Sequence, residues 1–221
     1  MQKRSRVLVL LLFVAVLLVP TGRVLAGSRV GLWHMEDPDE MVDSSGEGND
    51  GETTDIESVA GIDGRGYRFN GRTSVVEVAS AGSLNPGGDD VEFTVHMRFD
   101  QVPGTDFDVI RKGLGDTEGG EYKMQVAPTR DGTAARANCT FHGSSGNGKV
   151  SGDQDVADGT WHSVRCVKTK NAIEIVVDGE HTMQRVQIGK ISNDEPLTIG
   201  AKSFPDDQFR GDMDEASVRI G

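Results

Sequence analysis

The chain has 221 residues and a formal net charge of −12, because 35 acidic residues outnumber 23 lysines and arginines. Such a charge repels phosphate groups, which argues against nucleic acid or an anionic membrane as a general partner. Beyond the N-terminus, the sequence shows no cluster of basic residues that would form a local exception.

The first 26 residues have the pattern of a secretory signal peptide. Three basic residues precede an apolar run over 7–20, and Ala26 ends a small-residue cleavage signature. An uncleaved membrane anchor is the alternative, but the run is shorter than the roughly 20 residues that a spanning helix needs. We therefore expect a signal peptide over 1–26, a secreted protein without membrane insertion after cleavage, and a single domain over 27–221. Cleavage would leave 195 residues with a net charge of −16.

The two cysteines, Cys139 and Cys166, fit an exported protein. An even number of cysteines in an oxidising compartment favours one disulfide over two free thiols. Two widely spaced thiols without a CxxC or a nearby histidine pattern do not make a zinc site. We expect a stabilising disulfide between two strands.

Short segments with period-two patterns fill most of the remaining chain, and no helical stripe is evident. The clearest strand is 91–99, where alternate residues are apolar. The run over 172–177 leads into Asp178-Gly179, a dipeptide typical of tight hairpin turns. The other expected strands are 30–35, 66–69, 74–79, 107–112, 122–127, 135–141, 161–168, 186–188, 196–200 and 215–220. Many short strands predict an all-β sandwich or barrel, with mobile Gly-rich loops around 44–51 and 143–152.

Four segments, 31–51, 61–99, 158–180 and 196–221, resemble in this order the laminin G-like jelly rolls of secreted bacterial proteins. The resemblance covers nearly the whole mature chain. It implies a two-sheet antiparallel β-sandwich of the concanavalin A-like kind. Members of that family mostly act as recognition or adhesion modules, with carbohydrate as the commonest inferred ligand and proteins as a second class.

A calcium site is expected where the first strand ends beside the last one. The loop 43–50 should lie next to 212–214, and Asp214 shares the parity of the apolar residues after it, so it should point inward. A buried carboxylate needs a partner, and Ca²⁺ takes six to eight oxygen ligands. We expect Asp43, Asn49 and Asp214 to bind a structural calcium ion, with Asp50 as a further candidate. The alternative is an Asx turn at Asp43 and Asn49, with backbone N–H groups bound to Asp214.

The sequence shows no convincing catalytic set. Carboxylates alternate over 174–180 and 212–215, as in glucanases of this fold, but Asp178 is better explained by its turn and Glu215 points away from Asp214. Trp33 and Trp161 are expected in the core rather than on a sugar-binding platform. The loops after Phe99, around 113–120 and over 142–158 are candidate binding loops.

The sequence therefore predicts a noncatalytic recognition module that binds a glycan or a cell-surface component. A protein-binding adhesion or structural domain is the first alternative. A polysaccharide hydrolase or lyase is the second.

The calcium hypothesis predicts that stability depends on the ion. A ligand that binds only the folded state raises the melting temperature through mass action. We expect the protein to melt at a higher temperature in excess calcium than in chelator. Equal melting temperatures, measured by calorimetry, would remove the hypothesis.

Overall fold

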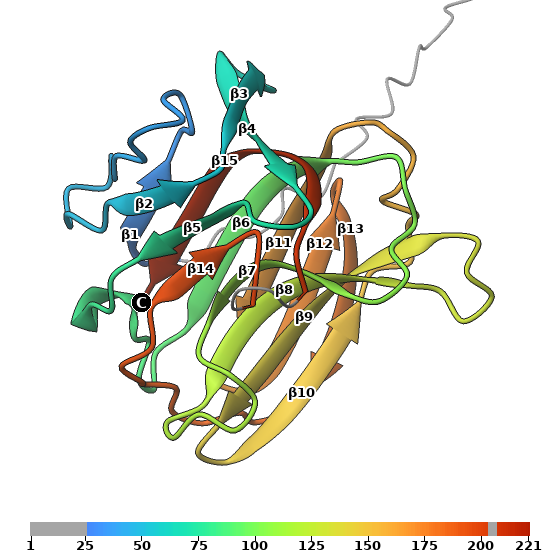
Figure 1. The fold of residues 1–221 in the computed structure, drawn as a ribbon. Helices are drawn as coiled ribbons and strands as arrows, with labels where there is room; N and C mark the ends of the chain where they lie inside the picture. The colour runs from blue at the N-terminus through green and yellow to red at the C-terminus, as the bar shows by residue number, and fades with distance from the viewer. Residues whose placement is uncertain (1–25, 203–206) are drawn as a thin grey trace, which may run out of the picture.

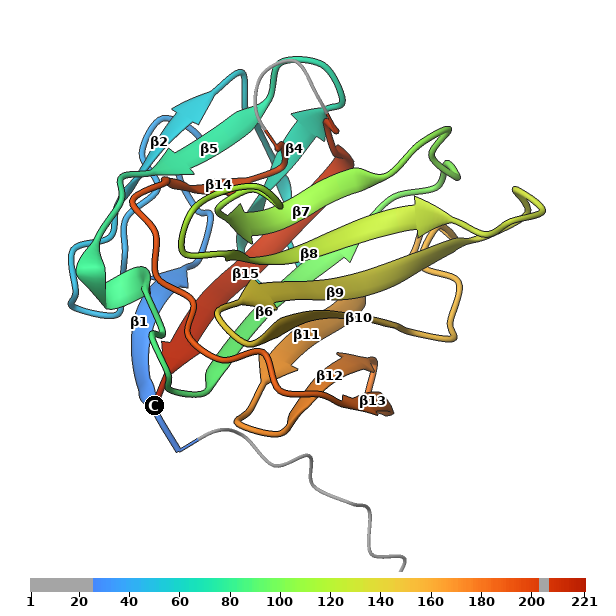
Figure 2. The same cartoon turned by 90° about the horizontal axis from the view of Figure 1, so that it is seen from below.

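The computed structural model describes residues 26–202 and 207–221, which form two antiparallel sheets packed face to face (Figures 1 and 2). The expected signal peptide over 1–26 lies almost entirely outside these residues. No helix within the described part of the chain has the length and apolar content to span a membrane. The all-β sandwich expected from the sequence is confirmed.

The first sheet has eight strands, with the C-terminal strand β15 near its middle. Its order is β13 (Glu180–Arg185), β12 (Ala172–Val177), β11 (His162–Lys168), β6 (Val91–Arg98), β15 (Arg210–Ile220), β4 (Arg65–Asn70) and β3 (Glu57–Ala60), while β1 (Ser28–Trp33) pairs with the second half of β15.

The second sheet has seven strands, and it lies in front of the first sheet in Figure 1. Its order is β10 (Gly146–Ser151), β9 (Ala135–Gly143), β8 (Glu121–Pro128), β7 (Phe107–Lys112), β14 (Leu197–Ile199), β5 (Val75–Val78) and β2 (Gly51–Thr54); one short 3-10 helix, η1 (Gly82–Leu84), follows β5.

The core lies between the sheets and follows the expected alternation. Along β6, the apolar side chains at 91, 93, 95 and 97 are fully buried. Phe93 contacts Tyr122 and Phe141 of the opposite sheet, with ring centroids 5.2 and 5.8 Å apart. Trp33 is also fully buried, and its indole Nε1 donates to the carbonyl of Asn49 at 2.8 Å. The ring contacts of Phe93 join the two layers.

Two expectations about the middle of the chain were wrong. Residues 146–151, expected within a mobile loop, form the edge strand β10, which pairs with β9 alone. Strand β13 ends at Arg185, so 186–188 is not a strand. Beyond this point the chain reaches the β9–β10 turn, where the carbonyl of Ile188 accepts the N–H of Ser145 at 2.9 Å.

The hairpin turn and the adjacent chain ends were predicted correctly. Asp178 and Gly179 both have positive φ, 50° and 87°, as a tight turn of this type requires. Strand β1 lies antiparallel to β15, with Trp33 opposite Ala216.

The disulfide between Cys139 and Cys166 is confirmed, and it joins β9 of one sheet to β11 of the other, with 5.6 Å between the Cα atoms. Both cysteines are fully buried. The bond therefore links the two layers through the core.

Replacing both cysteines with alanine should lower the free energy of unfolding by about 3 kcal/mol, because the bond closes a 27-residue separation in the unfolded chain. Denaturant unfolding would measure this change. Reductant should destabilise the wild type to a similar extent and leave the double variant unaffected. Equal stability of the oxidised wild type and the double variant would show that the bond contributes nothing.

Candidate functional site

A row of charged side chains crosses the outer face of the first sheet, beside the start of β15. Asp212 lies directly opposite Arg68 of β4 and Arg98 of β6 in the strand ladders. The next residue, Met213, is fully buried in the core, so the side chains of the row point away from the core, on the outer face of the sheet. Trp161, just before β11, continues the row, since the Arg98 guanidinium lies over its ring, 4.7 Å from the centroid.

Asp212 holds the two arginines in place. Its oxygens accept hydrogen bonds from Nε and Nη2 of Arg68 at 2.8 and 3.1 Å, and from Nε and Nη2 of Arg98 at 3.2 and 2.7 Å. Burial alone would raise the pKa of Asp212, but the bonds to Arg68 and Arg98 outweigh burial and keep the pKa below its usual value. Asp212 therefore stays ionised, and both guanidinium groups are fixed.

These residues line an open groove with a volume of about 570 Å³. A third arginine, Arg210, is exposed at the groove and donates from Nη1 to Oε1 of Gln101 at 2.7 Å. Gly211 lines the groove too, and a Cβ there would lie 2.6 Å from the carbonyl oxygen of Arg98. The full lining is Arg68, Phe69, Asn70, Arg98, Phe99, Asp100, Gln101, Gly159, Arg210, Gly211 and Asp212.

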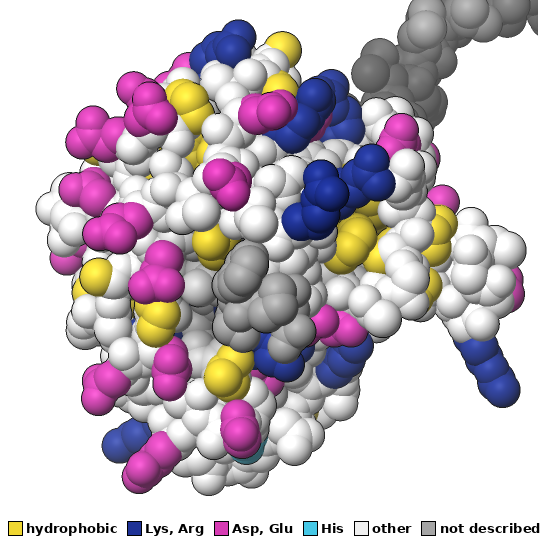
Figure 3. Space-filling model, in the orientation of Figure 1, with side chains coloured by type: hydrophobic (Ala, Val, Ile, Leu, Met, Phe, Trp, Pro, Cys, Tyr) yellow, Lys and Arg dark blue, Asp and Glu magenta, His cyan; other side chains and the backbone are white. Residues whose placement is uncertain are grey.

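The surface around the end of β4 and the start of β15 is richer in cations than the rest of the visible face. Figure 3 shows Lys and Arg side chains close together in its upper part, whereas Asp and Glu are spread along the left edge. On the face seen in Figure 3, positive and negative side chains are therefore unevenly distributed.

His162 anchors the segment that carries Trp161. Its Nδ1 lies 2.7 Å from Oδ2 of Asp178, and its Nε2 lies 3.0 Å from Oδ1 of Asp158. Asp158 also accepts the backbone N–H of Thr160 at 2.8 Å. The segment 158–161 is therefore tied to the turn after β12, which holds Trp161 beside Arg98.

The predicted calcium ligands Asp43 and Asn49 lie together, within one network in the β1–β2 loop. Oδ1 of Asp43 accepts the N–H of Leu32 and of Ser45, and Oδ2 accepts the hydroxyl of Ser45 and the N–H of Asn49. Burial would raise the pKa of Asp43, yet these bonds outweigh it and lower the pKa. Asp50 joins the network by accepting the N–H of Asp43 at 2.7 Å.

The third predicted ligand, Asp214, has a different set of partners. It is fully buried and accepts N–H bonds from Ile62 at 2.8 Å, Asp63 at 3.1 Å and its neighbour Glu215 at 2.8 Å. Burial raises the pKa of Asp214 by more than these bonds lower it. Both halves of the alternative reading, the Asx turn and the backbone-bound carboxylate, are present, and calcium binding by Asp43, Asn49 and Asp214 stays a prediction.

The expected inward direction of Asp214 was wrong. Asp214 lies opposite His96 and therefore on the outer face, where the turn between β3 and β4 covers it. A β-bulge between Asp214 and Ser217 adds one residue to β15, and Glu215 has a φ of 50° there. Alternation fails across a bulge because the extra residue reverses the parity of all those after it.

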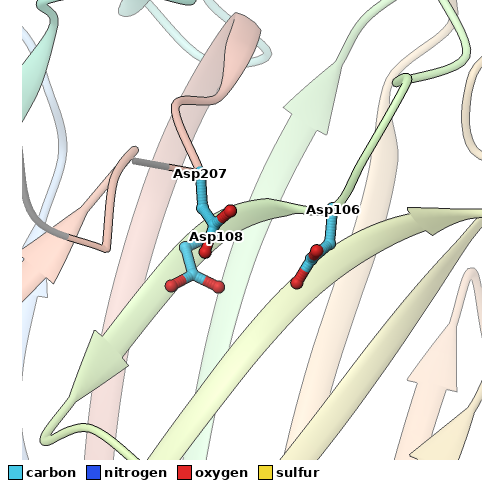
Figure 4. A group of neighbouring side chains, drawn as sticks. All are labelled: Asp106, Asp108 and Asp207. Carbon is cyan, nitrogen blue, oxygen red and sulfur yellow. The ribbon is translucent and has the colours of Figure 1, made fainter. Parts of the chain in front are cut away.

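A second acidic set lies at the start of β7, beside the segment that precedes β15. Asp106, Asp108 and Asp207 have ligand atoms within 4.8 Å of one another, and Figure 4 shows their carboxylates close together. Asp108 is fully buried, and Arg111 donates to its Oδ2, while Lys123 Nζ lies 3.8 Å from its Oδ1. These three carboxylates could contribute to a metal site, although Arg111 and Lys123 already lie next to the buried one.

Of the expected binding loops, the one after Phe99 supplies Asp100 and Gln101 to the groove. The loops at 113–120 and 142–158 contribute to two smaller hollows. Trp161, expected in the core, is only half-buried and supports Arg98. Sequence reasoning missed the arginine row because its members are distant in the chain and meet only through strand order.

A family model described as the concanavalin A-like lectin/glucanases superfamily matches residues 70–219. A search of curated proteins found no match.

Solved structures share the fold at low sequence identity. The binding domain of Paraclostridial Mosquitocidal Protein 1 superposes with a TM-score of 0.69 and 14% identity over 87% of this chain and 48% of that one. Domain 4 of AbnA, a GH43 extracellular arabinanase from Geobacillus stearothermophilus, solved with arabinotriose, gives 0.66 and 14% over 88% and 93%. The binding domain of Botulinum Neurotoxin DC in complex with SialylT gives 0.63 and 10% over 87% and 48%. The chain thus spans about half the length of the structures of Paraclostridial Mosquitocidal Protein 1 and Botulinum Neurotoxin DC.

The His162 network predicts a pH-dependent stability. Burial lowers the pKa of His162, but its bonds to Asp178 and Asp158 outweigh burial and raise the pKa above 6.5. A raised histidine pKa contributes stability that is fully present below about pH 6.5 and is lost as the pH rises through the folded-state value. The melting temperature of the wild type should therefore exceed that of His162→Gln by more at pH 5.5 than at pH 8.5. A difference that does not change with pH would show that the imidazole does not bind a proton more tightly in the fold.

Proposed function

Because the chain belongs to the concanavalin A-like lectin/glucanases superfamily, we propose that it is a noncatalytic recognition module that binds carbohydrate in the groove beside Asp212. The observation that carries this proposal is the groove itself, where strand pairing fixes charged donors around an open space of about 570 Å³. That volume lies within the range of small-ligand sites.

The structural neighbours support carbohydrate as the ligand class. One is an arabinanase domain solved with arabinotriose, and two are binding domains, of which the one from Botulinum Neurotoxin DC was solved in complex with SialylT. Each of these is described as a domain or a binding domain. We infer that this chain, which has the same fold, is likewise a binding domain.

The chemistry of the groove argues against hydrolysis. Glycosidases generally need two carboxyl groups, one of which donates a proton. Only Asp100 and Asp212 bring carboxyl groups to the described lining, and both oxygens of Asp212 are already bonded to Arg68 and Arg98, so Asp212 is available neither as a proton donor nor as a nucleophile. Elsewhere, the candidate residues Glu174 and Asp178 contact histidines, His181 and His162.

Export is part of the proposal. The buried disulfide fits an oxidising compartment, and the N-terminal pattern predicts a signal peptide. The module would then meet its ligand outside the cell.

Filling the groove should abolish binding without unfolding the protein. We expect Gln101→Trp to remove binding to the glycans that the wild type retains on an array, because an indole at this exposed position would occupy the groove. The matched control is Gln184→Trp, which places the same ring at an exposed position on β13.

Three outcomes of this test count against the proposal. Retention of binding by Gln101→Trp would place the ligand elsewhere. Absence of any glycan binding, with capture of a surface protein instead, would favour the adhesion alternative. Release of reducing sugar by the wild type would favour an enzyme.

A further inference from the structure

The groove has an excess of hydrogen-bond donors. Arg68, Arg98 and Arg210 carry three positive charges into it, against the two negative charges of Asp100 and Asp212. Across the whole chain acidic residues are in the majority, 35 to 23. The groove therefore has the opposite sign of charge from the chain as a whole, which suggests a ligand of opposite charge.

Asp212 is not available as an acceptor for a ligand. Its two oxygens already take four N–H contacts from Arg68 and Arg98, and the residue is 4% exposed. Oε1 of Gln101 accepts from Arg210. The exposed carboxylate of Asp100 is thus the one charged acceptor left in the described lining.

Donors remain free on all three arginines. No hydrogen bond within the described residues uses Nη1 of Arg68 or of Arg98, and Arg210 uses only its Nη1. The Arg98 guanidinium is held by Asp212 at one edge and by the Trp161 ring on one face. Fixed guanidinium groups bind carboxylates and sulfates strongly because two N–H groups match two oxygens.

We propose that the groove is selective for an acidic saccharide, whose carboxylate or sulfate binds the free N–H groups of Arg68, Arg98 and Arg210. The inference rests on the proposed carbohydrate-binding function and names its ligand class. A neutral sugar hydroxyl both donates and accepts, and Asp100 is the one charged side chain of the described lining that could accept from its donor. An ionised carboxylate or sulfate only accepts, which suits a donor-rich groove.

The open shape of the groove favours a charge carried by a polymer. A space of about 570 Å³ exceeds that of a lone anion and admits sugar rings. Apart from this region, the net charge of the protein repels a polyanion, so binding would depend on the groove.

Two matched pairs of polysaccharides test the proposal. Polygalacturonate and its fully methyl-esterified form differ in the carboxylate charge, and dextran sulfate and dextran differ in the sulfate. Isothermal titration calorimetry of the full chain should give at least ten-fold tighter binding to one charged member than to its neutral partner. The preferred pair identifies the group as carboxylate or sulfate, and the affinity should fall as salt is raised.

Arg210→Gln is the informative variant, because Arg210 is exposed and has no ion pair in the described structure that folding would lose. It should weaken binding to the charged polymer roughly ten-fold, the effect of losing one charge-assisted contact. Arg68→Gln should act in the same direction. Arg185→Gln removes an exposed arginine from β13, far along the sheet order from the groove, and should leave the affinity unchanged.

The possible failures are distinguishable. Equal binding of charged and neutral members, unaffected by Arg210→Gln, would overturn the selectivity and leave carbohydrate binding in place. Equal weakening by Arg210→Gln and Arg185→Gln would show that overall charge, and not the groove, attracts the polymer. Binding of no polysaccharide, acidic or neutral, would overturn the proposed function together with this inference.

Discussion

The nearly buried carboxylate of Asp212 is the constraint on which the arrangement of this face depends. It lies on a central strand, and an unpaired charge there would cost several kcal/mol. Arg68 and Arg98 compensate it from the two neighbouring strands. A one-residue slip of β15 would turn Asp212 into the core and Met213 out of it, so the charge and the register enforce each other. The same interaction leaves the two guanidinium groups fixed at the surface.

A second buried carboxylate, Asp214, shows another solution to the same problem. Backbone N–H groups of the β3–β4 turn bind it in place of cations. The bulge after it allows β15 to turn Met213 inward, Asp214 outward and Ala216 inward again over a spacing of three residues. Within five residues of β15, Asp212 therefore fixes the arginines of the groove, Asp214 fixes the β3–β4 turn, and Ala216 packs in the core again.

Local sequence patterns predicted much of the fold correctly. Alternation over 91–99 predicted β6, the Asp-Gly pair predicted the turn at 178–179, and the two cysteines predicted a disulfide between two strands. That these strands belong to different sheets was not predicted. The apolar alternation did not predict the edge strand β10, which has the sequence GNGKVS and pairs on one side only. The single extra residue at Glu215 likewise has no signature in the sequence, and it reversed the predicted direction of Asp214. The groove was not predictable from local sequence, because Arg68, Arg98 and Arg210 meet only once β4, β15 and β6 are neighbours.

An NMR titration can test whether the guanidinium groups fixed by Asp212 bind an acidic saccharide. It follows the arginine side-chain Nε–Hε resonances while an oligogalacturonate or a sulfated oligosaccharide is added. Binding in the groove predicts that the signals of Arg68, Arg98 and Arg210 shift together and saturate at one ligand concentration, while that of Arg111 on the opposite sheet stays in place. Shifts confined to Arg111 and its surroundings, or spread evenly over all arginines, would contradict it.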